Sequence, residues 1–210
     1  MRPRSAVAHR KVLEAAAELF AERGMDATSM DAIAEAAGAS KATIYKHWGD
    51  KDALCLAVLA HLHGLDEERP AFNSGDFRRD LIAQLAYEPG VERKAMREKL
   101  WPHLVAYSAR NPAFGTAWRA RVMEPAKKCL SQTIEHGEKL GVLNMRGVDR
   151  ETALAILLGP MIYRHVFLKG KGVRLTDLET HVADVFLSAF SAVPSRRLRP
   201  EIKVRRLRKA

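Results

Sequence analysis

The sequence contains only two cysteines, and neither is placed for a disulfide or a metal site. Cys55 and Cys129 lie far apart, and neither belongs to a CxxC motif or to a cluster of Cys and His. Isolated thiols on apolar helical faces are typical of reduced core residues in a cytosolic protein. His61 and His63 are two residues apart on an expected helix and so point in different directions, which is a poor geometry for sharing a metal. We expect no metal site.

Motifs of the common catalytic sites are missing as well. The sequence has no HExxH, no GxSxG and no GxxxxGK[ST]. The usual arrangements for a catalytic zinc, for a nucleophilic serine and for nucleotide phosphates are therefore not present. We expect a protein that is not an enzyme and that needs no cofactor.

Long hydrophobic runs are also lacking. The most apolar window, residues 153–163, contains a Gly-Pro pair and is about half as long as a helix that spans a bilayer. Residues 1–11 are charged but lack the hydrophobic stretch of a signal peptide. We expect a cytoplasmic protein without a membrane partner.

Positive charge is what the chain has in excess, and it is concentrated at the C-terminal end. The net charge is +10, and residues 194–210 hold eight basic residues and one acidic residue. A polyanionic partner is indicated, although the rest of the chain is only mildly basic. We interpret residues 194–210 as a basic mobile tail. It is a solvated extension, a source of non-specific DNA affinity, or a contact for acidic lipids.

Residues 28–51 have the pattern of two short helices joined by a tight turn. Thr28 and Asp31 are spaced as a capping box, and Gly38 supplies the positive φ that ends a helix. Ser40 is a good N-cap for the second helix, which turns Ile44 and Trp48 inward. The outward side chains of that helix are small, hydroxylated or cationic: Lys41, Ala42, Thr43, Tyr45, Lys46 and His47.

Such a helix fits the major groove of DNA, which is about 12 Å wide, and the whole pattern is that of a helix-turn-helix unit. The alternative is a pair of ordinary short helices without DNA contact. The segments that carry the pattern resemble the TetR family of bacterial transcriptional regulators: Leu19-Phe20, Gly24, Thr28, Ile33-Ala34, residues 37–48 and residues 51–54. The resemblance is specific over residues 1–60 and weak beyond them. Ala42 stands where Gly is common and Trp48 where Phe is common, which bears on the bases that are read.

We assign contact with base edges to Ala42, Thr43 and Lys46. Hydroxyl, imidazole and ammonium groups position a protein on phosphates, and we assign this role to Thr28, Ser40, Tyr45, His47 and Lys51. Lys41 is assigned to DNA contact in general. In the family, the position of Lys51 commonly touches the DNA backbone. One short helix makes few base contacts, so two copies related by a two-fold axis are needed to read a palindrome.

The hydrophobic pattern is helical throughout, so the predicted fold class is all-α. A first helix is expected at residues 5–23, a linking helix at 51–68, and further helices at 76–87, 92–110, 112–140, 150–168 and 177–192. Pro102 and Pro125 should kink or interrupt two of them. We divide the chain into a three-helix helix-turn-helix domain (1–50), a larger helical effector-binding and dimerisation domain (51–193) and the tail (194–210).

Residues 150–168 are apolar almost all round, which requires burial on more than one side. The resemblance implies that the last two long helices form a four-helix bundle in a homodimer, and we assign the interface to Leu158, Pro160, Ile162, Phe167, Val182 and Phe186. The alternative is that these residues are the core of one subunit.

The middle helices contain aromatic surface with a few polar tips, as small-molecule pockets do. We assign ligand contact to Trp101, His103, Tyr107, Trp118, Met123 and Tyr163, with ordinary core packing as the alternative. The resemblance implies a repressor released from its operator when a small hydrophobic effector enters a pocket beneath the fourth helix. The alternatives are a DNA-packaging protein without regulatory function, and a helical dimer whose pocket is unused.

Overall fold

A computed structural model describes residues 3–68, 70–168 and 176–192, and within these ranges the chain forms helices and a single isolated β-bridge, between Leu143 and Ser191. The all-α prediction is confirmed. In chain order the elements are α1 (Pro3–Ala27), α2 (Met30–Ala37), α3 (Lys41–His47), α4 (Lys51–Leu62), α5 (Phe77–Ala86), α6 (Val91–Arg110), α7 (Pro112–Trp118), the π-helical segment η1 (Arg119–Met123), α8 (Glu124–Lys139), α9 (Arg150–Phe167) and α10 (Leu178–Phe190).

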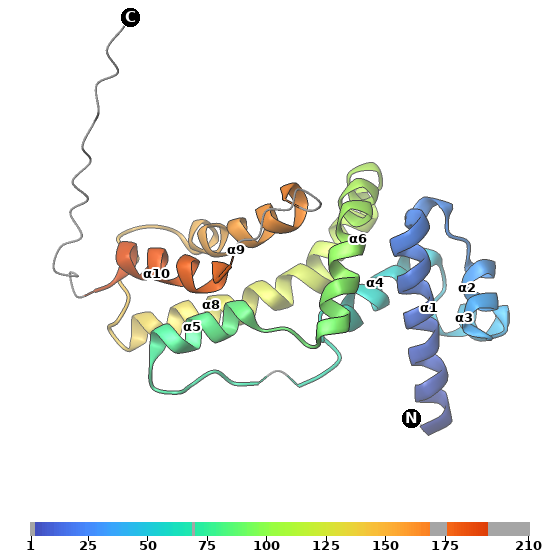
Figure 1. Ribbon diagram of the computed structural model, residues 1–210, viewed down its shortest axis with the longest axis horizontal. Helices are drawn as coiled ribbons and strands as arrows, with labels where there is room; N and C mark the ends of the chain where they lie inside the picture. Colours follow the sequence, from blue (N-terminus) through green and yellow to red (C-terminus); the bar gives the residue numbers. More distant parts are fainter. Residues whose placement is uncertain (1–2, 69, 169–175, 193–210) are drawn as a thin grey trace, which may run out of the picture.

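The helices pack around two separate hydrophobic clusters. The first core contains buried side chains of α1–α4, α6, α7 and η1, among them Phe20, Ile44 and Leu104. The second core is formed by α5, α8, α9, α10 and the loop after α8, and its centre includes Leu157 and Phe186. In Figure 1, α1–α3 lie at one end of the molecule, α5, α9 and α10 lie at the other, and α4 and α6 lie between them. The basic tail lies outside the described residues.

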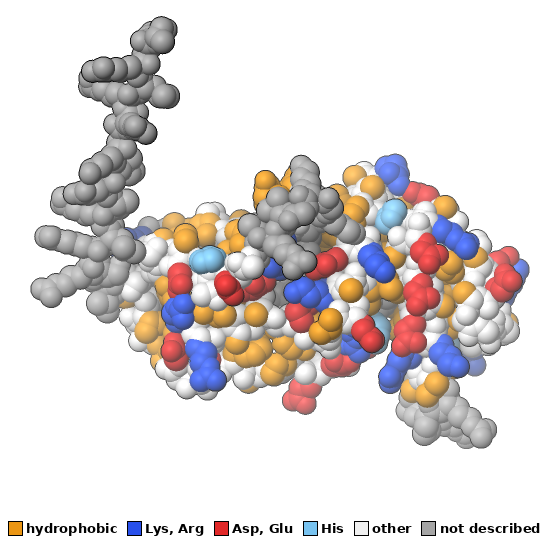
Figure 2. Space-filling model, in the orientation of Figure 1, with side chains coloured by type: hydrophobic (Ala, Val, Ile, Leu, Met, Phe, Trp, Pro, Cys, Tyr) orange, Lys and Arg blue, Asp and Glu red, His pale blue; other side chains and the backbone are white. Residues whose placement is uncertain are grey.

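The surface differs between the two ends. Figure 2 shows acidic and basic side chains interspersed along α1, whereas hydrophobic side chains reach the surface at the end that holds α5, α9 and α10. Among the described helices, none is both long enough and apolar enough to cross a bilayer.

The linking helix α4 is shorter than the predicted 51–68 and ends at Leu62. Gly64 has a φ of 62°, which stops the helix, and a Cβ at this position would lie 2.7 Å from Cβ of Pro89. The chain therefore turns away at Gly64, with the loop before α6 packed directly against it. Gly64 is a local stop signal that the predicted bounds of this helix overlooked, whereas its contact with Pro89 depends on a distant segment.

The two prolines expected to disturb helices, Pro102 and Pro125, have different effects. Pro102 does not split α6, which continues from Val91 to Arg110. Before Pro125 the helix widens into η1, in which the Glu124 N–H donates to the Arg119 carbonyl, five residues earlier. A proline has no N–H and its ring clashes with the preceding turn, so a π-helical turn there accommodates the ring. The predicted interruption at Pro125 is confirmed in this form.

Helices α9 and α10 each place one face in the second core. Val182 and Phe186 are 8% and 1% exposed, so the prediction that they form a subunit interface is wrong. Leu158 and Pro160 are half-buried, while Ile162 and Phe167 are exposed. The large hydrophobic side chains on the outer surface of these two helices are Ile156, Ile162, Tyr163 and Phe167 on α9, and Val185 on α10.

Candidate nucleic-acid interface and effector cavity

Helix α2 begins one residue later than the predicted capping box requires. Its N-cap is Ser29, whose hydroxyl accepts the Ala32 N–H at 3.1 Å. Thr28 is only 1% exposed, and its hydroxyl donates to the Gly24 carbonyl at 2.7 Å. The prediction that Thr28 caps α2 together with Asp31 and reaches a phosphate is therefore wrong. Its side chain instead joins the start of α2 to the last turn of α1.

The turn and the start of α3 have the predicted geometry. Gly38 has a φ of 62° and ends α2, and the Ser40 hydroxyl accepts the Thr43 N–H at 3.2 Å to begin α3. Ile44 and Trp48 are 1% and 6% exposed and belong to the first core. These two side chains fix α3 on the molecule by its inner face, so its outer face is free.

That outer face carries the side chains assigned to DNA. All six are exposed: Lys41, Ala42, Thr43, Tyr45, Lys46 and His47. Lys41 forms an ion pair of 2.5 Å with Asp31 of α2, in which both side chains are more than half exposed and can exchange partners with solvent or phosphate. The exposure of this face is confirmed, and its contacts with DNA stay a prediction.

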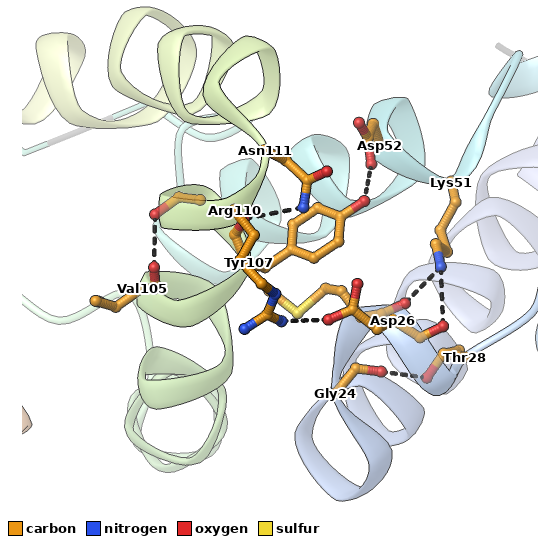
Figure 3. Close-up of polar contacts among 11 residues, drawn as sticks. Gly24, Asp26, Thr28, Lys51, Asp52, Val105, Tyr107, Arg110 and Asn111 are labelled. Carbon is orange, nitrogen blue, oxygen red and sulfur yellow. Dashed lines mark hydrogen bonds and ion pairs between the residues drawn. The ribbon is translucent and has the colours of Figure 1, made fainter.

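Lys51 has a structural role that the sequence did not indicate. Its ammonium donates to the carbonyl of Met25 at 2.5 Å and lies 3.4 Å from the carbonyl of Asp26, both in the last turn of α1 (Figure 3). A cation at the C-terminal end of a helix satisfies carbonyls that have no partner within the helix. Lys51 thus fastens the start of α4 to the end of α1.

A second set of polar contacts connects α6 to the same corner. The Tyr107 hydroxyl donates to Oδ1 of Asp52 at 2.7 Å, and Arg110 forms an ion pair with Asp26 (Figure 3). Burial, followed by the hydrogen bond to Asp52, raises the pKa of Tyr107. Tyr107 therefore remains neutral and acts as a donor that positions α4, a structural role beside its predicted ligand contact.

A cavity of about 210 Å³ lies between the two cores, and we call it the seam cavity. Its apolar wall combines residues packed on the first core with residues of the second: Leu85, Trp101, Met123, Leu130, Leu158 and Met161. Two of the six predicted ligand contacts, Trp101 and Met123, line this cavity. The wall is built from α5, α6, η1, α8 and α9, so its composition follows from packing between distant segments.

The other predicted ligand contacts do not line the seam cavity. The His103 ring packs on α1, where its Nδ1 would lie 3.1 Å from a Cβ at Gly24. Trp118 is 8% exposed and meets Trp101 edge to face with 5.7 Å between ring centroids. Tyr163 is 53% exposed on the outer surface of α9. These three residues and Tyr107 lie outside the seam cavity, and their contact with a ligand stays a prediction.

Two polar side chains of the cavity wall differ in their hydrogen bonding: Trp101 has no partner among the described residues, whereas Arg97 is engaged with other parts of the protein. The indole N–H of Trp101 is buried and makes no hydrogen bond. Arg97 donates to the carbonyl of Leu62 at 2.6 Å and pairs with Glu88. Since Leu62 is the last residue of α4, Arg97 connects the cavity wall to the end of the linking helix.

Two further cations enter the cavity wall. Lys127 donates to Glu151 at 2.6 Å and to Glu124 at 3.1 Å, and these hydrogen bonds raise the pKa of its ammonium. Arg164 pairs with Glu179 at 2.8 Å. Sequence reasoning missed all three cations of the wall, because a basic residue on an amphipathic helix resembles any solvated side chain until the neighbouring helices are placed.

Comparisons with known proteins agree with this architecture. Residues 12–58 match the family model of bacterial regulatory proteins of the tetR family, and residues 72–185 match that of the tetracyclin repressor-like C-terminal domain. The chain is 28% identical over 196 residues to the uncharacterized HTH-type transcriptional regulator YdeS of Bacillus subtilis, covering 91% of this chain and 92% of the relative. It is 32% identical over 153 residues to the DNA-binding transcriptional repressor TetR of Mycobacteroides abscessus, covering 70% of this chain and 77% of the relative. A solved structure of a TetR-family regulator from Rhodococcus sp. superposes with a TM-score of 0.64 at 22% identity, over 87% of this chain and 100% of the other.

Proposed function

Since the chain belongs to the TetR family and is a helix-turn-helix transcriptional regulator, we propose that it is a cytoplasmic, homodimeric repressor that leaves a palindromic operator when a small ligand fills the seam cavity. The exposed outer face of α3, fixed from behind by Ile44 and Trp48, is the observation that carries the DNA-binding part. The cavity between two cores carries the part about ligand response.

In this proposal α3 enters the major groove. Ala42, Thr43 and Lys46 meet base edges, because they lie on the exposed face and offer a small apolar group, a hydroxyl and a cation. Contact with phosphates falls to the remaining assigned side chains at the ends of the helix: Ser40, Lys41, Tyr45, His47 and Lys51. Lys51 uses part of its donor capacity on α1, and an ammonium has three donors, so one remains for a phosphate.

Dimerisation in this proposal uses the outer surface of α9 and α10. Ile156 and Tyr163 lie seven residues apart, two helical turns, and are 39% and 53% exposed, while Ile162 is 38% exposed at the side of this face and also lines the seam cavity. On α10, Val185 is 65% exposed. A two-fold arrangement would bury these hydrophobic side chains against the same helices of a second subunit. Leu158, Pro160 and Phe167 lie at or beside this surface, whereas Val182 and Phe186 do not.

The response to a ligand follows from where the seam cavity lies. The first core contains α1–α3, which read DNA, and the second core contains α9 and α10, which would hold the dimer together. A ligand that fits only one relative position of the two cores shifts the spacing between the reading helices of the dimer. The Arg97 contact with Leu62 gives this shift a direct route into α4.

Selection of bound DNA from a random pool tests the proposal. We expect a palindrome with half-sites about one helical turn apart or a multiple of it. Protection of DNA without a defined palindrome would instead indicate the packaging alternative. Addition of cavity ligands to the protein bound to its selected site should release the DNA; a protein that no bound ligand releases has a cavity without this role.

A further inference from the structure

We infer that the seam cavity takes a compact organic anion, a carboxylic acid with an aromatic or branched apolar body. This inference rests on the proposed ligand response and adds the chemical class of the effector. It follows from three features of the wall: a hydrophobic surface contributed by both cores, an excess of cations over acids, and an indole N–H that lacks an acceptor.

The hydrophobic part of the wall selects the body of the ligand. Leu85, Met123, Leu158 and Met161 are all partly buried hydrophobic residues packed at the edges of the two cores. The volume of about 210 Å³ lies below the ~300–1,000 Å³ of typical ligand pockets, so the body must be compact. Methionine side chains adapt to flat and to branched shapes.

The charged part of the wall selects an anion. Arg97, Lys127 and Arg164 line the cavity, whereas Glu88 is the single acidic residue among the lining residues described. Arg97 is committed to Glu88 and to the end of α4, and Arg164 is committed to Glu179. The partners of Lys127 are different: Glu124 and Glu151 are 59% and 73% exposed and lie outside the lining.

Lys127 is therefore the anchor for the ligand carboxylate. Its own side chain is only 19% exposed, whereas both of its partners are well solvated. Solvated carboxylates hold an ammonium weakly, and a carboxylate delivered inside the cavity would compete with them at low cost in desolvation. Charge-assisted hydrogen bonds of this kind are stronger than neutral ones.

The indole N–H of Trp101 adds a demand for an acceptor. It is buried, it makes no hydrogen bond in the structure, and its residue lines the cavity. A buried donor without an acceptor is unfavourable, so a ligand oxygen that meets this N–H after a small shift of the indole ring toward the cavity gains affinity. The N–H of Trp118 is also buried and unpaired, but Trp118 does not line the cavity, which makes it a matched control.

Two probes of nearly equal size separate charge from shape: indole-3-acetate and its neutral amide, indole-3-acetamide. Titration calorimetry with the full-length protein should show the acid binding about tenfold or more tightly than the amide. Equal affinities, tighter binding of the amide, or binding of neither probe would overturn the inference.

The variants Lys127→Met and Lys128→Met locate the anchor. Lys128 is the neighbouring residue, but it is exposed and does not line the cavity. We expect Lys127→Met to abolish the preference for the acid while the amide still binds, and Lys128→Met to leave the preference unchanged. An unchanged preference in folded Lys127→Met, shown by parental helical circular dichroism, would overturn the assignment.

Trp101→Phe and Trp118→Phe test the donor, because each keeps a ring and removes one buried N–H. Trp101→Phe should weaken binding of the acid by about tenfold, and Trp118→Phe should leave it unchanged. Equal effects of the two substitutions would overturn the role of the Trp101 N–H. Release of operator DNA is scored separately: acid that binds without releasing DNA contradicts the proposed ligand response and leaves the chemical class of the ligand standing.

Discussion

At the scale of single residues, Lys46 and Lys51 are both cations of the DNA-binding end, but they have different surroundings. Lys46 is exposed and makes no hydrogen bond or ion pair with any other described residue, whereas Lys51 is half-buried on the end of α1. We expect Lys46→Ala to weaken binding to the selected operator by about 1–3 kcal/mol and to relax the preference for one base pair. Competition gel shifts with single-base variants of the operator measure both. Equal loss on every sequence would instead make Lys46 a phosphate contact.

Lys51→Ala should have two effects that Lys46→Ala lacks. Binding should weaken alike on all sequences, and the slope of log K against log salt should fall by about one, as expected when a phosphate contact is lost. The free energy of unfolding should also fall by roughly 1 kcal/mol, because the Met25 carbonyl loses its donor. Urea unfolding and a salt series measure the two effects independently. A variant with parental stability would contradict the fastening role of Lys51.

His9 links the stability of this end to pH. Its ring is half-buried on Trp48, with centroids 4.6 Å apart, and lies 5.8 Å from the His47 ring. Burial, followed by the charge of His47, lowers the pKa of His9 below 6.5. At a pH between the lowered pKa of His9 in the folded protein and its ordinary value of 6.5 in the unfolded chain, the unfolded chain binds more protons than the folded protein. Stability is therefore lost as the pH falls below 6.5.

We therefore expect the free energy of unfolding to decrease as the pH is lowered from about 7.5 to about 5.5. His9→Phe keeps an aromatic ring on Trp48 but cannot take up a proton, so its decrease should be shallower. Urea unfolding at a series of pH values compares the two proteins. The same slope in both would show that other groups cause the pH dependence.

At the scale of elements, Gly38 and Gly64 end α2 and α4 in the same backbone conformation, with a φ of 62° in each. A Cβ at Gly38 would meet nothing within 4 Å, whereas a Cβ at Gly64 would lie 2.7 Å from Pro89. Gly38→Ala should cost about 1–2 kcal/mol of unfolding free energy, the strain of a left-handed residue. Gly64→Ala should cost clearly more, because Pro89 must also move. Thermal or urea unfolding ranks the pair, and equal losses would show that the loop before α6 yields freely.

The comparison of Gly38 with Gly64 also shows which helix ends could be predicted from the sequence: those that depend on residues close by in the chain. The signals at Gly38 and Ser40 are local, because each cap acts within a few residues of itself, and both have the predicted roles. The end of α4 has a local signal as well, Gly64, and only its close contact with Pro89, 25 residues further along the chain, is non-local. Thr28 also fits the capping-box pattern, but the break at Gly24 turns its hydroxyl toward α1.

The two candidate sites also differ in how far local sequence predicts them. The outer face of α3 could be predicted, because Ile44 and Trp48 set the buried side of one short helix. The seam cavity could be predicted only in part, because its wall is built from five elements. Trp101 and Met123 were identified as aromatic or flexible hydrophobic residues, but nothing in their own segments distinguishes them from Trp118, which fills the first core.

At the scale of the whole molecule, the first core holds the proposed DNA-binding helices and the second core holds the proposed dimerisation helices. The distance between two α3 helices would be set by the contact between two subunits. The exposed hydrophobic surface of α9 and α10 is the proposed contact, and Val185 lies on it at 65% exposure. Val91, at the start of α6, is 85% exposed but lies outside this surface. The two valines therefore allow the same substitution to be made inside and outside the proposed interface.

Val185→Glu should give a monomer that keeps the parental helical content, because a carboxylate between two α10 helices would lose its hydration without gaining a partner. Val91→Glu should remain dimeric. Light scattering after gel filtration measures the mass, and gel shifts on the palindromic site should show weak binding for the monomer alone. Each reading helix would then dock without its two-fold partner and lose half of the base contacts. A dimeric Val185→Glu would exclude this surface as the contact between subunits, whereas a dimer lost in both variants would mean that charge alone separates the subunits.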